Sequence, residues 1–300
     1  MRDQPPPRAP PHEGNGTVSR GIKVLIVAAV LAVSCSGESE APSQADAPTT
    51  QSTPAATPTP GITEDDVAEI EDAVRDYRAA GDENDFAARQ DVSTGALSDY
   101  YGLMVSSALD KNSLPLSTTA INDLEVEEVD GDSATVAIDA VITPWGEAPE
   151  PVKMRGTYSV IRTPSGWKIA DYTERNGEPF SANVYTDLDS HQEHGGLELS
   201  VVGVDLSDPT YATVFVSVQN HSDKRYSSYE ALLLDGEGNQ HTGNIVTESS
   251  ILPGAKLSGM YQFPLGQDAS DSKQLRLAVS YYDETSYSDD LEFDVDVKLR

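Results

Sequence analysis

The spacing of apolar residues changes once along this chain, and that change limits the folds it can adopt. Between residues 63 and 109 the apolar residues recur at steps of three and four, which is the pattern of one helix face. After Pro115 they recur at every second residue, which is the pattern of a half-buried strand. Helices followed by a meander of strands predict an α+β layer, in which the helices pack on a curved antiparallel sheet.

Local signals divide the first region into three helices. Thr63, with Asp66 three residues later, forms a capping-box pattern at the start of the first helix, and Gly81 ends that helix. The apolar face of the helix consists of Val67, Ile70, Val74 and Tyr77. Two further helices are expected at residues 85–93 and 97–109.

Turn residues divide the second region into four strands. Alternation over residues 121–129 and 134–140 is interrupted by Asp130-Gly131-Asp132, an acidic glycine turn typical of a β-hairpin. A second pair of strands, at residues 152–163 and 167–173, is separated by Pro164-Ser165-Gly166. We therefore expect one α+β domain over residues 63–183.

A resemblance to a known family lies in the second pair of strands. The segments are Gly156-Thr157-Tyr158-Ser159-Val160-Ile161 and Gly166-Trp167-Lys168-Ile169-Ala170-Asp171. Preceded by the long helix, they resemble the cone-shaped NTF2-like domains of secreted actinobacterial proteins. That family contains both enzymes and non-catalytic binders, so the fold alone does not assign a function. The resemblance implies ionisable residues inside the cone, for which the candidates are Asp99, Tyr100, Tyr101, Asp139 and Tyr158. Tyr101, Asp139 and Tyr158 are the possible pocket residues.

Catalysis in this cone is the alternative to binding. No histidine occurs between His12 and His191, so a histidine acid or base is excluded from this domain. A buried Asp with a raised pKa and a Tyr hydrogen-bond donor would instead serve an enzyme of isomerase, dehydratase or hydrolase type. A cone filled by Trp167, Tyr158 and Met154 would count against it. The sequence contains no phosphate loop, nucleophile elbow or paired-cysteine metal site, and we assign no catalytic residue.

Seven short apolar or alternating runs follow, and they predict an immunoglobulin-like β-sandwich over residues 196–300. The runs are 197–204, 212–218, 230–234, 251–252, 258–263, 275–282 and 291–299. A second resemblance lies in the order of three segments, Val216-Ser217-Val218-Gln219-Asn220, Leu232-Leu233-Leu234-Asp235 and Leu252-Pro253-Gly254. This order is similar to that of the telokin-like, immunoglobulin-like domains of Gram-positive lipoproteins. The resemblance implies an extracellular adhesion or interaction module.

The stretch between the two domains has no apolar period and ends in Gly195-Gly196, so we expect an interdomain linker over residues 184–195. It also contains a cluster that suggests a metal site, made of Asp187, Asp189, His191, Glu193 and His194. A structural zinc site normally needs four preorganised ligands. We therefore favour the linker and expect no metal.

The N-terminus has the order of a secretory signal. Arg20 and Lys23 precede an unbroken apolar run at residues 24–33, which is shorter than the about 20 residues of a transmembrane helix. The residues Ala32-Val33-Ser34 before Cys35 resemble the bacterial lipobox, with Ala32 where Leu is more common. The resemblance implies a lipoprotein signal peptide over residues 1–35 and a diacylglyceryl group on Cys35. Two acyl chains anchor a protein stably to a membrane. Cys35 is the single cysteine of the chain, so no internal disulfide is possible.

Composition describes the remainder of the chain. Residues 36–62 are rich in Ser, Thr and Pro and cannot bury enough apolar surface to fold, so we expect a disordered tether. Without residues 1–35, which hold four basic and two acidic residues, 16 Lys+Arg remain against 48 Asp+Glu, a formal charge of −32. This negative charge argues against nucleic acid as a partner, because the phosphate backbone of nucleic acid is also negative. We interpret it as a solvated acidic surface, with cation binding as the alternative.

Together these features predict a lipid-anchored, extracytoplasmic binding or interaction protein that is not an enzyme and needs no cofactor. The expected partners are the membrane, through the lipid, and either a cell-surface protein or a small apolar ligand. A solute-capture lipoprotein that feeds a transporter is less favoured, because such proteins are usually two-lobed α/β folds and the chain has no alternating βαβ pattern.

Overall fold

The structure is a computed structural model. It describes residues 63–107, 109, 114, 116–146, 150–174, 177–247, 249–265, 274–287 and 290–299. The predicted signal peptide, the predicted tether and Cys35 lie outside the described residues. Within them, no helix is long and apolar enough to cross a membrane.

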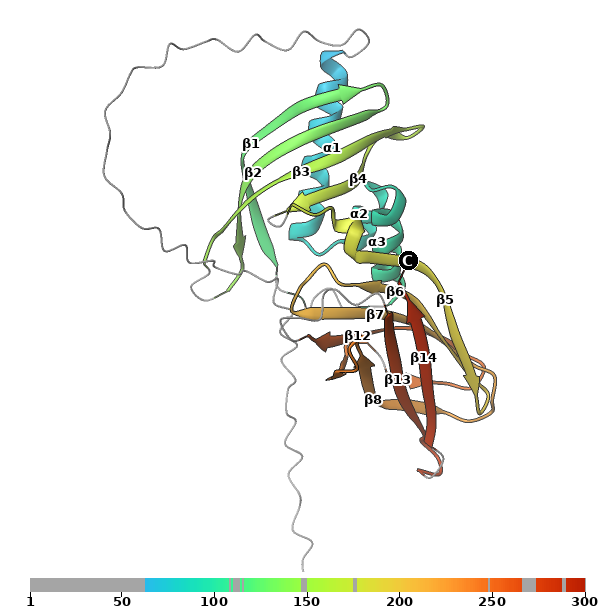
Figure 1. The fold of residues 1–300 in the computed structure, drawn as a ribbon. Coiled ribbons are helices and arrows are strands. Elements are labelled where there is room, and N and C mark those ends of the chain that lie inside the picture. The colour runs from blue at the N-terminus through green and yellow to red at the C-terminus, as the bar shows by residue number, and fades with distance from the viewer. Residues whose placement is uncertain are drawn as a thin grey trace, which may run out of the picture.

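The first half of the fold places three helices against one antiparallel sheet (Figure 1). The helices are α1 (Glu64–Asp82), α2 (Phe86–Asp91) and α3 (Gly95–Ser106). The strands are β1 (Ser117–Asp130), β2 (Ser133–Pro144), β3 (Val152–Thr163) and β4 (Gly166–Glu174), and they pair in chain order. The three predicted helices and both predicted hairpins are thus present.

Capping and anchoring residues set the ends of α1. The Thr63 side chain accepts the backbone N–H of Asp66, while the Asp66 carboxylate accepts the backbone N–H of Thr63 at 3.0 Å, so the predicted capping box is confirmed. At the other end, the Asp82 carboxylate accepts the backbone N–H of Thr119 at 2.6 Å and the hydroxyl of Ser117 at 2.7 Å. The last turn of α1 is therefore fixed to the start of β1.

Alternation along the strands builds the core of this half. Four residues of β2, Ala134, Val136, Ile138 and Ala140, point toward the helices and are buried. Ile70, Val74 and Tyr77 of α1 cover them from above. Each strand therefore gives one face to the helices and the other to solvent.

The second half is a sandwich of two antiparallel sheets. Its elements are η2 (Phe180–Asn183), β5 (Val184–His194), β6 (Leu197–Asp205), β7 (Tyr211–Asn220), β8 (Tyr226–Leu234), β9 (Gln240–Thr242), β10 (Asn244–Ile245), β11 (Ser250–Ile251), β12 (Lys256–Pro264), β13 (Gln274–Asp283) and β14 (Asp290–Lys298). One sheet has the order β10-β12-β7-β6-β5, and the other has β11-β8-β13-β14 with β9 also paired to β8. All seven strands predicted after residue 196 are present.

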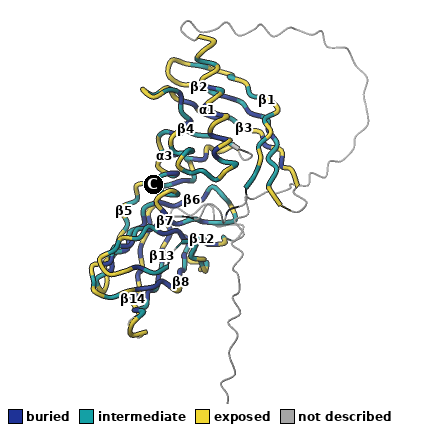
Figure 2. Tube along the Cα trace, turned by 180° about the vertical axis from the view of Figure 1, so that it is seen from behind, coloured by how far each residue is buried: buried dark blue, intermediate teal, exposed yellow. Residues whose placement is uncertain are grey.

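The two sheets of the sandwich share one apolar core. It contains residues such as Leu199, Val216, Leu277 and Phe293, which come from both sheets. Figure 2 shows these buried segments along β6, β7 and β13, with exposed segments at the turns. The sheets are joined by packing alone, since a chain with one cysteine has no disulfide.

The prediction of an interdomain linker at residues 184–195 is wrong, because residues 184–194 form strand β5. β5 pairs with β6 over its length, with a register shift between Thr186 and Ser190, and Asp187 has a left-handed φ of 62°. It is the edge strand of its sheet. Backbone hydrogen bonds to β6, rather than burial of alternate side chains, therefore hold it in place, and this leaves no apolar period to detect.

The two halves share a packed interface. Phe215 of β7 points away from the sandwich core, yet only 2% of it is exposed. Its ring lies edge-on to the ring of Tyr100 in α3, with the centroids 5.8 Å apart. Gly203 pairs with Phe215 across the sheet, and a Cβ there would lie 2.4 Å from Cδ1 of Leu103. Helix α3 therefore rests directly on the sheet of β6 and β7.

Truncating Phe215 tests this interface. We expect Phe215→Ala to lower the free energy of unfolding by about 3–5 kcal/mol, the usual cost of deleting a buried phenyl ring. Phe215→Leu keeps most of the contact and should cost much less. Chemical denaturation measures both variants. An unchanged midpoint for Phe215→Ala would contradict a packed interface.

Candidate functional site

Aromatic rings fill the interior of the first half. Tyr77 of α1 lies among Tyr101, Tyr158 and Tyr172, with ring centroids 6.0, 5.8 and 6.0 Å away. Tyr172 in turn stacks on Phe180 at 4.8 Å. Rings at these distances are in contact. The space that a ligand would need is therefore occupied by side chains.

A cation lies among these rings. Arg89 of α2 donates from Nη1 to the Tyr101 hydroxyl at 3.0 Å, and its guanidinium stands 4.7 Å from the Tyr77 centroid. The Tyr77 and Tyr101 hydroxyls are hydrogen-bonded at 2.7 Å. Arg89 Nε is buried and has no hydrogen-bond partner among the described residues. Ring faces and phenol oxygens therefore stabilise this positive charge.

The pKa values of two tyrosines, Tyr77 in this cluster and Tyr100 beside it, are raised. Burial raises the pKa of Tyr77 well above its ordinary value, and the pKa of Tyr100 is raised first by burial and then by the charge of Asp205. A phenol with a raised pKa can donate a hydrogen bond but is a poor proton acceptor at neutral pH. The cluster is therefore suited to structural hydrogen bonding.

The possible pocket residues are brought together only in part. Tyr101 and Tyr158 both lie in this core, on either side of Tyr77. Asp139 was expected to face the interior, and that prediction is wrong. It lies on the outer face of the sheet, where Arg155 Nε donates to it at 2.7 Å and Asn122 at 3.1 Å. The alternation of β2 contained this signal, because Asp139 stands between the inward residues Ile138 and Ala140.

The other two candidates lie elsewhere. Asp99 is exposed on α3. Tyr100 reaches the interface between the halves and hydrogen-bonds to Asp205 of β6. Burial raises the pKa of Asp205, while hydrogen bonds from Ser207 and Tyr100 oppose the increase. The pair joins two segments about a hundred residues apart, and no local sequence signal predicts it.

The acidic and histidine-rich residues of β5 do not converge. His191 Nδ1 lies 3.6 Å from Asp189, whereas His194 Nδ1 contacts the carbonyl oxygen of Glu292 at 3.2 Å. Across the described ranges, no group of three or more His, Cys, Asp or Glu side chains could hold a metal ion.

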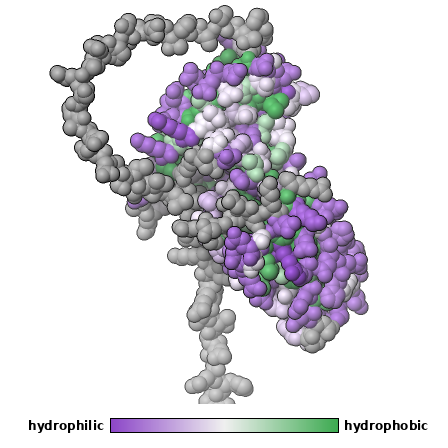
Figure 3. Space-filling view, in the orientation of Figure 1, coloured by the Kyte–Doolittle hydropathy of each residue, from purple (hydrophilic) through white to green (hydrophobic). Residues whose placement is uncertain are grey.

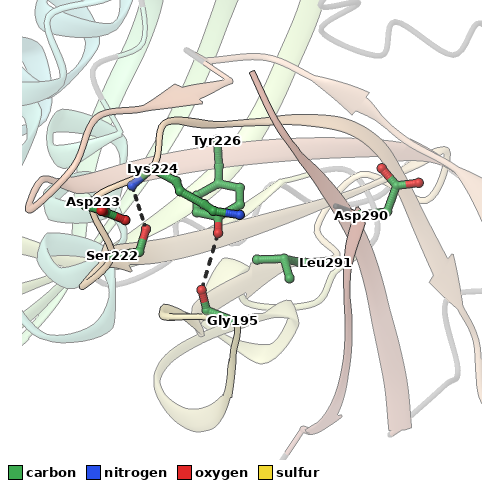
Figure 4. A pocket seen from close by; sticks show the side chains of 7 residues that line it. All are labelled: Gly195, Ser222, Asp223, Lys224, Tyr226, Asp290 and Leu291. Carbon is green, nitrogen blue, oxygen red and sulfur yellow. Dashed lines mark hydrogen bonds between the residues drawn. The ribbon is translucent and has the colours of Figure 1, made fainter. Parts of the chain in front are cut away.

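A cavity of about 490 Å³ lies in the sandwich beside the β5–β6 turn, the β7–β8 turn and the start of β14. Figure 4 shows its lining residues, Gly195, Ser222, Asp223, Lys224, Tyr226, Asp290 and Leu291. Tyr226 and Leu291 form an apolar floor, and the Tyr226 hydroxyl donates to the carbonyl oxygen of Gly195 at 3.4 Å. The cavity is shallow and open to solvent.

Asp283 fixes the lysine at the rim of this cavity. Its side chain is 3% exposed and lies 3.1 Å from Lys224 Nζ. The Thr285 backbone N–H, donating at 2.8 Å, and the Lys224 ammonium lower the pKa of Asp283 to about 2. The sequence did not identify this cavity, because its residues come from three separate turns.

Comparisons with known proteins give little further information. No protein-family model and no curated protein matches this chain. Among solved structures, one similar chain is a proposed aromatic ring hydroxylase from Novosphingobium aromaticivorans. It is 20% identical with a TM-score of 0.31, and the match covers 38% of this chain and 90% of that chain. Similarity at this level assigns neither activity nor substrate.

The tyrosine–arginine cluster makes a stability prediction. Tyr101→Phe removes the hydroxyl that serves both Tyr77 and Arg89, so we expect the free energy of unfolding to fall by about 1–3 kcal/mol. The matched control is Tyr229→Phe, whose ring is 49% exposed and whose change should stay within about 0.5 kcal/mol. Equal effects in urea denaturation would argue against the network.

Asp283 makes a pH prediction. Its folded pKa of about 2 lies below its ordinary value of 3.8, so its stabilising effect is complete above about pH 4 and is lost as the pH falls toward 2. Asp283→Asn should therefore lower the melting temperature at pH 7 and reduce its dependence on pH between 4 and 2. Asp123→Asn, at an exposed position in β1, should leave that dependence unchanged.

Proposed function

We propose that this chain is a lipid-anchored, extracytoplasmic interaction protein without catalytic activity, whose binding surface is the free end of its second domain. The observation that carries this proposal is the packing of Tyr77, Tyr101, Tyr158 and Arg89 in the first half. A substrate of an enzyme acting in the cone would need the space that these side chains occupy. The same packing stiffens the first half as a support.

The domain resemblances fit this division of roles. An NTF2-like layer with a filled cone serves as a rigid spacer, and a telokin-like, immunoglobulin-like sandwich provides the interaction module. The contact between Tyr100 of the NTF2-like layer and Phe215 of the sandwich fixes the position of the sandwich relative to that layer. Open turns surround the 490 Å³ cavity, and a partner can reach them without displacing core residues.

The arrangement of the two halves also supports a tethered protein. Helix α1 begins at Glu64, next to the predicted tether, and its first turn lies at one end of the molecule (Figure 1). β13 ends and β14 begins at the opposite end. A lipid on Cys35 would therefore attach the protein through the end that carries α1 and leave the cavity end free to meet a partner. The formal charge of −32 that remains without residues 1–35 disfavours contact of the chain with anionic headgroups.

Removing the acylated thiol tests the anchor. We expect Cys35→Ser to abolish incorporation of a labelled fatty acid and to move the protein from the membrane fraction to the soluble fraction, because the thiol is the only lipid attachment point. Ser39→Ala, four residues further along, should keep both properties. Labelling of the Cys35→Ser chain, or wild-type protein found only in the soluble fraction, would reject the anchor.

A further inference from the structure

Three tyrosines lie together on the outer face of the β8–β13–β14 sheet. Tyr282 contacts Tyr229 and Tyr287, with ring centroids 5.8 Å apart in each case. Tyr229 is 49% exposed and Tyr287 is 77% exposed. We name these three residues the tyrosine face. It borders the cavity, because Tyr282 pairs with the cavity residue Asp290 across the sheet.

Two backbone irregularities present the outer rings of this face. Tyr229 is the extra residue of a β-bulge, since Ser280 pairs with Glu230 while Tyr281 pairs with Ser228. Tyr287 has a φ of 52°, a left-handed conformation that is strained for a bulky residue. Strained backbone positions cluster at active sites and ligand-binding sites.

The charge beside the tyrosine face is negative. The outward residues of β14 are Asp290, Glu292, Asp294 and Asp296, all exposed, and we name them the acidic row. Arg276 of β13 forms an ion pair with Asp294. Ser280 of β13 pairs with Glu292 of the acidic row on one side and with Glu230 of β8 on the other, so one further carboxylate flanks the sheet next to the rings.

Two cations that pair with Asp283 and Glu284, directly after Tyr282, are already engaged. Lys224 pairs with Asp283, and Arg225 Nε lies 2.8 Å from the Glu284 carboxylate. Glu284 also accepts the hydroxyl of Ser250 at 2.7 Å. The potential over the tyrosine face is therefore set by the acidic row. Figure 3 shows that the side of the sandwich that carries β13 and β14 is mostly hydrophilic.

We propose that the tyrosine face and the acidic row bind a cationic segment of a protein partner. Lysine or arginine side chains of that segment lie over the rings of Tyr229 and Tyr287, where the π-electrons attract cations. Asp290 and Glu292 receive the neighbouring positive charges. This partner class deepens the proposed function and rests on it. A neutral glycan would use the rings but would gain nothing from the acidic row.

The test measures binding of a fluorescein-labelled decapeptide of alternating lysine and arginine to the full chain in detergent, by fluorescence anisotropy at 0.15 M salt. The double variant Tyr229→Ser/Tyr287→Asn keeps the net charge, and asparagine tolerates the left-handed backbone at residue 287. We expect its Kd to rise about tenfold, the size of two exposed cation–π contacts. Trp145→Ser removes an exposed aromatic residue elsewhere and should leave the Kd unchanged.

A second pair of variants separates local charge from overall charge. Asp290→Asn/Glu292→Gln and Glu125→Gln/Glu127→Gln each remove two negative charges, the latter from exposed positions on β1. We expect the first to raise the Kd about fivefold and the second less than twofold, because distant charges are screened over about 8 Å. Melting temperatures of all four variants confirm that they remain folded.

Three results would overturn the inference. The tyrosine double variant could bind as tightly as the wild type, or both charge variants could lose affinity equally, which would indicate non-specific attraction. A neutral chito-oligosaccharide could bind through the tyrosines while the peptide does not, which would identify a glycan site. None of these results affects the anchor test at Cys35, so failure of this inference and failure of the proposed function are distinguishable.

Discussion

A continuous line of aromatic contacts holds the two halves of this protein as one body. It runs from Tyr158 through Tyr77, Tyr101 and Tyr100 to Phe215, with successive ring centroids 5.2–6.0 Å apart. The first three rings belong to the core of the helical half, and the last belongs to the sandwich. Its last contact, between Tyr100 and Phe215, packs α3 against the sheet of β6 and β7. The orientation of the second domain relative to α1 depends on it.

The same packing explains how a charged residue is tolerated in the first half. A guanidinium withdrawn from water is costly unless its charge is compensated. Arg89 obtains that compensation from the Tyr101 hydroxyl and from two ring faces, and the rings in turn are held by the Tyr77–Tyr101 hydrogen bond. Burial keeps Tyr77 protonated, which preserves that bond at neutral pH. The polar groups of this core therefore contribute to its cohesion.

The features that favour binding concentrate at the end of the sandwich opposite α1. The cavity lined by Tyr226 and Leu291, the ion pair of Lys224 with Asp283, and the exposed ring of Tyr287 all lie in or next to the turns there. Ordered strands behind these turns hold them in position.

The sequence by itself determined the elements whose causes are local. The capping box at Thr63, the turn at Gly131, and the periods of the helices and strands involve residues a few positions apart, so they can be read directly. Tertiary structure decided the rest. Strand β5 exists because β6 supplies its hydrogen bonds, and Asp205 meets Tyr100 across the interface. Arg89 has its place among the rings only after α2 packs on α1 and α3. These outcomes depend on partners distant in the chain, which no local pattern specifies.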